Sequence, residues 1–106
     1  MANPELSYPY EKFMVAIYCF ASASDIRTRI YSAFTSFMTL KSSDFNAFPD
    51  IQSEFDDLKS ALTKVKASGD EGNVQATLNA ISDDEAAAIA SKIVDIHLMI
   101  SRARFG

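Results

Sequence analysis

Nine consecutive residues from Phe13 to Ala21 read Phe-Met-Val-Ala-Ile-Tyr-Cys-Phe-Ala and contain neither a charged side chain nor an amide. No polar stripe interrupts the run, so a helix built from it would be apolar on every side. Such a helix has to be covered by other helices or by a second subunit. In a chain of 106 residues, the run therefore predicts either the central helix of a small bundle or half of a subunit interface.

The overall composition indicates one globular domain spanning residues 1–106. Hydrophobic residues make up 48% of the chain and charged residues 23%, which is ordinary for a soluble domain. Three Gly and three Pro are too few for an all-β fold with many tight turns. The formal net charge of −4 argues against broad, sequence-independent binding of nucleic acid, because such binding needs clustered cations.

The N-terminal segment and the cysteine content predict a cytoplasmic protein that is not attached to a membrane. The residues before Phe13 lack the basic region of a signal peptide, and Glu5 and Glu11 are acidic. The apolar run is also far shorter than the ~20 residues that cross a bilayer. Cys19 is the only cysteine. A single cysteine inside an apolar run is typical of a buried side chain in a reducing compartment.

Hydrophobic periodicity predicts five helical segments joined by short connections. The third has the clearest seam, in which apolar residues step by three and four positions along one face. Its members are Ile51, Phe55, Leu58, Leu62 and Val65. The expected segments are about Pro9–Ala21, one that starts at the Ser22–Asp25 joint, one that opens at Pro49, a short one carrying Val74, Leu78 and Ile81, and Asp83 to about Ala103.

Capping and turn residues mark the expected joints. Ser22–Asp25 and Ser82–Glu85 both have the Ser-x-x-acid pattern of a capping box, which predicts a helix start after each serine. Residues 41–48 read as a loop. Residues 68–73 read as a turn, with Gly69 as the left-handed cap of the preceding helix. Short joints favour antiparallel neighbours. The sequence therefore predicts an all-α fold, a compact antiparallel bundle of four to five helices.

The chain carries more aromatic surface than a domain of this size easily buries, with eight Phe and four Tyr. All four tyrosines lie on the first two predicted helices, and tyrosine is enriched at protein interfaces. We therefore expect a homo-oligomer, most simply a two-fold dimer. The alternative is that the tyrosines rim a monomeric core with their hydroxyl groups in water. The interface candidates are Tyr10, Phe13, Met14, Ile17, Tyr18 and Tyr31.

No residue pattern predicts a catalytic, cofactor-binding or metal-binding site. His97 is the only histidine, so the sequence predicts neither a multi-histidine metal site nor a catalytic triad within one chain. The acidic groups at residues 54–57 and 83–85 fall in the first turns of predicted helices, where capping and the helix dipole explain them. The 68–73 segment lacks the ligand spacing of a calcium loop and the Gly-Lys-Ser/Thr of a phosphate-binding loop.

Arg27 and Arg29 form a local basic patch that could contact an anionic partner or make salt bridges within the bundle. The last two helices also have the outline of a helix-turn-helix. However, the last one begins Asp83-Asp84-Glu85, which DNA phosphates would repel. Nucleic acid is therefore not the expected partner.

These observations favour a small non-enzymatic helical interaction protein that acts through protein–protein contacts. A regulator, an immunity or antitoxin-like factor, and an accessory subunit all fit this description. Two alternatives stay open: a nucleic-acid-associated regulator that uses the arginine patch, and a binder of a small apolar ligand in the bundle core.

Overall fold

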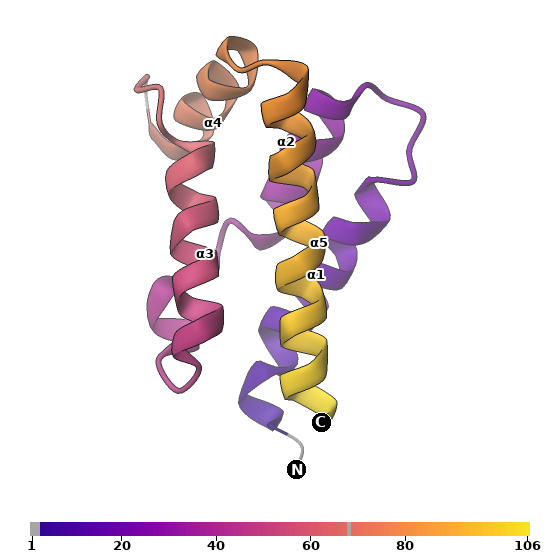
Figure 1. Ribbon diagram of the computed structural model, residues 1–106, viewed down its shortest axis with the longest axis vertical. Helices are drawn as coiled ribbons and strands as arrows, with labels where there is room; N and C mark the ends of the chain where they lie inside the picture. Colours follow the sequence, from indigo (N-terminus) through magenta and orange to yellow (C-terminus); the bar gives the residue numbers. More distant parts are fainter. Residues whose placement is uncertain (1–2, 68) are drawn as a thin grey trace.

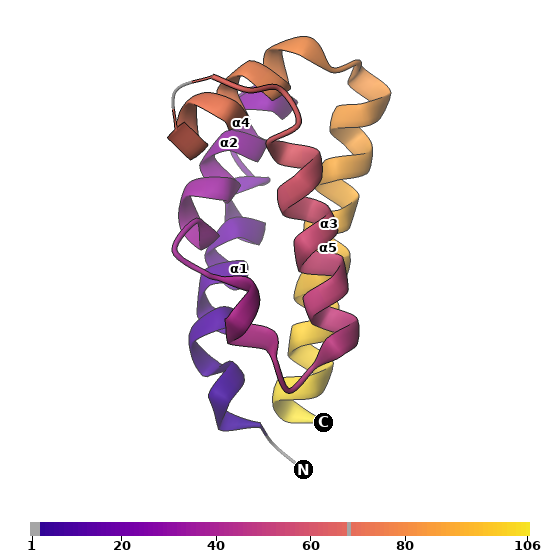
Figure 2. The same cartoon turned by 90° about the vertical axis from the view of Figure 1, so that its left-hand side faces the viewer.

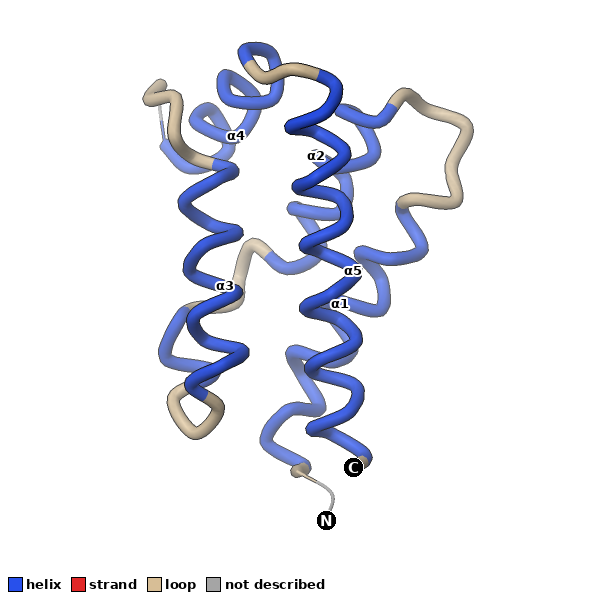
Figure 3. Tube along the Cα trace, viewed as in Figure 1, coloured by secondary structure: helices blue, strands red, loops and turns tan. Residues whose placement is uncertain are grey.

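The computed structural model describes residues 3–67 and 69–106, which form helices joined by loops, without a strand among them (Figure 3). The elements are a 3-10 turn at Pro4–Leu6, α1 (Ser7–Cys19), α2 (Ile26–Phe37), a second 3-10 turn at Ser42–Phe45, α3 (Pro49–Leu62), α4 (Gly69–Ala80) and α5 (Asp83–Phe105). The predicted all-α bundle is confirmed.

The long helices α1, α2, α3 and α5 run roughly along one axis, and α4 lies across one end of them (Figures 1 and 2). α1 contacts α2 on one side and α5 on the other, while α3 packs against α5 from the opposite side. α4 closes the space between α2 and α3. The first described residues and the C-terminus lie together at the other end, where the backbone N–H of Asn3 donates to the carbonyl oxygen of Arg104 at 3.1 Å.

The core between the four long helices is built around a cluster of phenylalanine rings. Phe13 of α1 and Phe37 of α2 stack with their ring centroids 4.7 Å apart. Phe55 of α3 meets each of them edge-on, at 6.4 Å in both cases. Because all three side chains are at most 1% exposed, this cluster ties three helices together. The seam Ile89, Ile93, Ile96 and Ile100 supplies the α5 side of the core.

α1 is open to solvent on one side, so it is not the fully surrounded central helix that was one of the two expectations for the apolar run. Phe13 and Ala16 are fully buried, but Val15 is 52% exposed and Tyr18 is 72% exposed. Its packed sides contact α2, α5 and the Phe55 ring of α3. α1 therefore has an outer side that is apolar in sequence and open to solvent.

The two predicted capping boxes have different outcomes. Ser82 and Glu85 form the expected box, with each side chain accepting the other residue's backbone N–H at 3.1 Å. Lys64 at 2.9 Å and this capping hold the pKa of Glu85 down to about 2. The Ser22–Asp25 box is not formed. Asp25 itself caps α2 by accepting the backbone N–H of Thr28 at 3.1 Å, so the helix begins at Ile26.

The connection from α3 to α4 differs from the prediction at both ends. α3 ends at Leu62, so Val65 lies beyond the helix whose seam it was expected to extend. Gly69 has the predicted positive φ of 73°, but it opens α4 instead of closing α3, and Ser68 lies outside the described residues. The buried Thr77 hydroxyl accepts the Val65 backbone N–H at 2.9 Å and fixes this connection on α4.

Candidate functional site

Large apolar side chains are exposed on the outer sides of α1 and α5. On α1 they are Tyr8, Val15 and Tyr18, and on α5 they are Val94, Leu98 and Phe105, which are 38%, 43% and 60% exposed. The Tyr8 hydroxyl lies 3.0 Å from that of Thr39, beyond the end of α2. We call the other five residues the α1–α5 face. Exposed apolar side chains that gather on neighbouring elements are typical of contact surfaces.

Ring contacts and a surface hollow show that α1 and α5 are adjacent and antiparallel along this face. The Tyr10 ring, near the start of α1, lies 5.7 Å from the ring of His97 and 5.0 Å from that of Phe105, centroid to centroid. Beyond the other end of α1, Phe20 lines a hollow together with Ala90 and Val94 of α5. The two helices thus form one continuous surface.

The structure places the predicted interface residues in three different environments. Tyr18 lies on the α1–α5 face, and Tyr10, Met14 and Ile17 are half-buried on the same helix. Phe13 is removed from the candidate interface because its ring is 0% exposed and stacks inside the core. Its position in the apolar run gave no sign of this, since every neighbour is equally apolar.

Tyr31 does not join this surface. It lies on α2, 6.3 Å from the ring of Phe34, and lines a separate hollow with Gln75 and Asn79 of α4. Conversely, sequence reasoning missed Val94, Leu98 and Phe105 of α5. The available signal was that Leu98 falls off the buried isoleucine seam of its helix.

His97 lies half-buried between α5 and α1 and stacks on Tyr10. Its Nδ1 atom is buried and has no hydrogen-bond partner among the described residues. Burial lowers the pKa of His97 below its usual 6.5, because the protonated ring would lose solvation there. The side chain is therefore neutral at pH 7 and serves as part of the packing between the two helices.

This environment predicts that the protein loses stability as the pH falls below about 6.5. The unfolded chain takes up the proton on His97 at a higher pH than the folded chain does, so acid favours the unfolded state. His97→Phe keeps an aromatic ring on Tyr10 and should remove this contribution. Urea titrations of both proteins at about pH 7.5 and about pH 5.5 measure it. A difference in unfolding free energy between them that does not change with pH would contradict the assignment.

Arg27 bonds to other parts of the fold, which is one of the two roles expected for the arginine patch. Its guanidinium donates to the carbonyl oxygen of Leu78 at 2.8 Å, to that of Ile81 at 2.7 Å, and to the carboxylate of Asp83 at 2.7 Å. The two carbonyl groups lie at the C-terminal end of α4, where a cation also complements the helix dipole. Arg27 thus joins α2 to the α4–α5 connection.

The Arg29 side chain points toward the connection between α1 and α2. Its Nη1 donates to the carbonyl oxygen of Phe20 at 3.1 Å, and its Nε is buried without a partner among the described residues. The pair Arg27/Arg29 is therefore used to position α2 against its neighbours. Of the two roles expected from the sequence, contact with an anionic partner or bonds within the bundle, the contacts agree with the second.

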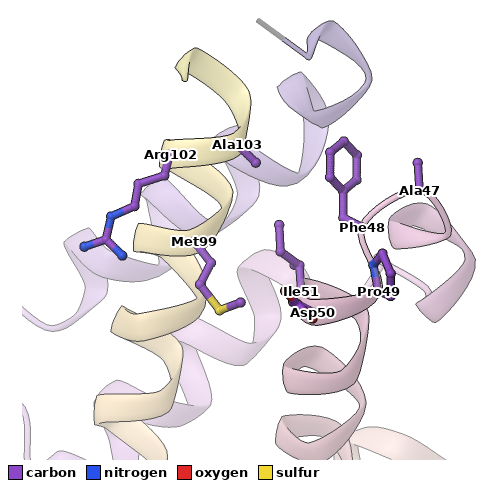
Figure 4. Close-up of a pocket in the computed structure, with 8 residues that line it drawn as sticks. All are labelled: Ala47, Phe48, Pro49, Asp50, Ile51, Met99, Arg102 and Ala103. Carbon is purple, nitrogen blue, oxygen red and sulfur yellow. The ribbon is translucent and has the colours of Figure 1, made fainter. Parts of the chain in front are cut away.

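An open groove of about 510 Å³ lies between the start of α3 and the end of α5 (Figure 4). Phe48, Ile51 and Met99 supply much of its apolar wall. Arg102 contributes its stem, while its guanidinium extends away from the groove in Figure 4. The groove is lined partly by the exposed Pro49 and Asp50, so it is a surface depression and not a cavity in the bundle core.

No cluster of metal ligands is found among the described residues. No three His, Cys, Asp or Glu side chains gather there in a way that could hold a metal ion. Cys19 is half-buried with its Sγ 3.9 Å from the Ser36 hydroxyl. Within residues 3–67 and 69–106, no helix combines the length and the apolar character that crossing a membrane requires.

Comparison with protein-family models, with curated protein sequences and with solved structures found no match for this chain.

Proposed function

We propose that this chain is a small helical interaction protein that acts through protein–protein contacts made by the α1–α5 face. The single observation that carries the proposal is the exposure of five large apolar side chains on two adjacent helices, with Tyr18 72% and Phe105 60% exposed. Interfaces are enriched in such aromatic anchors, whereas free surfaces avoid grouping them.

The arginine pair and the groove beside Met99 are weaker candidates for a binding site than the α1–α5 face. Arg27 and Arg29 bond to backbone carbonyl groups of the bundle, so the arginine patch does not favour a nucleic-acid partner. The groove beside Met99 is open, and the charged residues that line it, Asp50 and Arg102, are exposed to solvent, so it does not favour a small apolar ligand. We therefore place the activity on the α1–α5 face.

In biological terms, a regulator, an immunity or antitoxin-like factor, or an accessory subunit would all work through such a surface without catalysis. We place the protein in the cytoplasm, since its single half-buried cysteine suits a reducing compartment. Self-association belongs to the same proposal, because an exposed apolar face on a small domain is available to another copy of the chain.

Leu98→Asp tests the proposal, because it places a charge in the middle of the α1–α5 face without touching the core. The wild-type chain, carried on an affinity tag in its native cell together with an untagged copy, should capture a stoichiometric protein or the untagged copy. Leu98→Asp should lose that capture by at least about tenfold, as truncation or charging of a central interface residue does. Quantitative mass spectrometry of the eluates measures it.

The matched control is Ser60→Asp, which adds the same charge at an exposed position of α3. It should capture the same partner as the wild-type chain. Equal capture by the wild-type chain, Leu98→Asp and Ser60→Asp would show that the α1–α5 face is not the contact surface. The absence of any stoichiometric protein, untagged copy included, would overturn the interaction function itself.

A further inference from the structure

We propose that the α1–α5 face pairs with a second copy of the chain, with the two α5 helices antiparallel and Asp95 of each copy opposite Arg102 of the other. This inference rests on the proposed function and names its partner. It is carried by the spacing and the charges of the exposed side of α5.

The outer side of α5 has a heptad seam of its own. Ser91, Val94, Leu98, Ser101 and Phe105 are spaced by three, four, three and four residues. That is the spacing of the a and d positions with which paired helices contact one another. The seam is separate from the buried isoleucine residues of the same helix, which already pack inside the bundle. It is therefore an unused helix-pairing surface.

Two opposite charges flank this seam and have no direct partner in the described part of the chain. Asp95 and Arg102 are both exposed and make neither a hydrogen bond nor an ion pair through their side chains. The hydrogen bond to Glu54 is the main cause that raises the pKa of Lys92, and Asp95 adds to it only at longer range. Seven helical residues separate their backbones by about 10.5 Å, so the two side chains do not form a close pair within one helix.

Antiparallel pairing satisfies both charges at once. With Val94 set against Phe105 of the second copy, Leu98 faces Ser101, and Asp95 comes beside Arg102 on the same flank. The two-fold axis repeats every contact, which gives two ion pairs from one charged pair per chain. A parallel pairing would set Asp95 beside Ala90 or His97 of the second copy, which face their own α1. The charges therefore favour the antiparallel arrangement.

The orientation of Arg102 agrees with this assignment. Figure 4 shows its side chain leaving α5 on the side away from the groove that α5 forms with α3. Arg102 is exposed, so a second copy can reach its guanidinium. Tyr18, 72% exposed on the neighbouring α1, adds an aromatic side chain to the same contact.

A charge-exchange experiment tests the pairing and its orientation. Asp95→Arg alone sets two arginines together at each end of the dimer, and Arg102→Asp alone sets two aspartates together. Each single variant should self-associate about tenfold more weakly than the wild-type chain, since two exposed ion pairs become two repulsions. An equimolar mixture of the two should recover the affinity as a heterodimer, which native mass spectrometry identifies by its mass. The double variant Asp95→Arg/Arg102→Asp should also dimerise.

A cysteine pair provides a second readout that does not depend on charge. In a Cys19→Ser background, mixing Leu98→Cys with Ser101→Cys should give the mixed disulfide on mild oxidation, and Leu98→Cys alone should give little. Preferential formation of the Leu98→Cys homodimer would overturn the antiparallel register. So would single charge variants that associate as the wild-type chain does. If the wild-type copies do not associate while a foreign protein is still captured in a Leu98-dependent way, this pairing is wrong and the interaction function stands.

Discussion

Replacing Phe13 with alanine is expected to lower the free energy of unfolding by about 3–5 kcal/mol. The ring is 0% exposed, stacks on Phe37 at 4.7 Å and meets Phe55 edge-on. Its removal takes apolar surface out of the core, leaves a cavity between three helices and breaks aromatic contacts that add to burial. Because a small domain is stable by only about 5–15 kcal/mol, much of the stability would be lost. Urea titration followed by circular dichroism measures the change.

Val15→Ala is the matched control on the same helix, since Val15 is 52% exposed. We expect its effect on the unfolding of the monomer to stay within about 0.5 kcal/mol, as for other surface substitutions. Equal destabilisation by the two variants would mean that α1 is not oriented with Phe13 inward. The packing of α1 in the bundle would then be wrong.

Replacing Arg27 with alanine is expected to lower the free energy of unfolding by about 2–3 kcal/mol, although the residue lies on the predicted basic patch and not in the apolar core. The change leaves the carbonyl groups of Leu78 and Ile81 without their charged donor at the end of α4. Hydrogen bonds to charged groups are each worth about 1.5–3 kcal/mol, and solvent at this half-buried site replaces part of them. The same urea titration measures the loss.

Asp83→Asn separates the carbonyl contacts of Arg27 from its ion pair. The Asp83 side chain is 89% exposed, so its ion pair with Arg27 contributes at most about 1 kcal/mol, and its neutral replacement should have a small effect. Arg27→Lys should fall between wild type and Arg27→Ala, because one ammonium group cannot reproduce the planar fork. If Asp83→Asn were as destabilising as Arg27→Ala, the surface ion pair would be the main contribution, contrary to this account.

Regular apolar spacing predicted the parts of the fold that are held by a single buried seam. Ile51, Phe55, Leu58 and Leu62 are all buried along α3, and the Ser82–Glu85 box marks the start of α5. In these segments one face is apolar and the other is charged, so the pattern alone determines which side packs inward. The turn residues were less reliable, because contacts through Val74 and Thr77 extend α4 into a segment whose glycines favour a turn.

The candidate site could be predicted only in part, because uniform apolar character carries no direction. Within the run from Phe13 to Ala21, nothing in the residue types distinguishes the buried Phe13 from the exposed Val15 and Tyr18. The placement of α2 and α5 decides it. On α5 the reverse holds: two apolar seams share one helix, and only the structure shows that the isoleucines take the core while Leu98 stays outside.

Arg27 and Arg29 illustrate the remaining limit. Their sequence neighbourhood is compatible with both a free basic patch and internal contacts. The choice depends on the carbonyl groups of Leu78 and Ile81, which lie more than fifty residues away along the chain. Such long-range hydrogen bonds leave no periodic signal. Only the three-dimensional arrangement shows that this positive charge serves to hold α4 in place.

Sedimentation equilibrium of the wild-type chain across a range of concentrations is the most direct test of the claim that the α1–α5 face joins two copies. We predict that the mass rises from 11.7 kDa at low concentration toward twice that value at high micromolar concentration. Leu98→Asp should stay at 11.7 kDa throughout. A wild-type mass that remains at 11.7 kDa at every concentration would contradict the account.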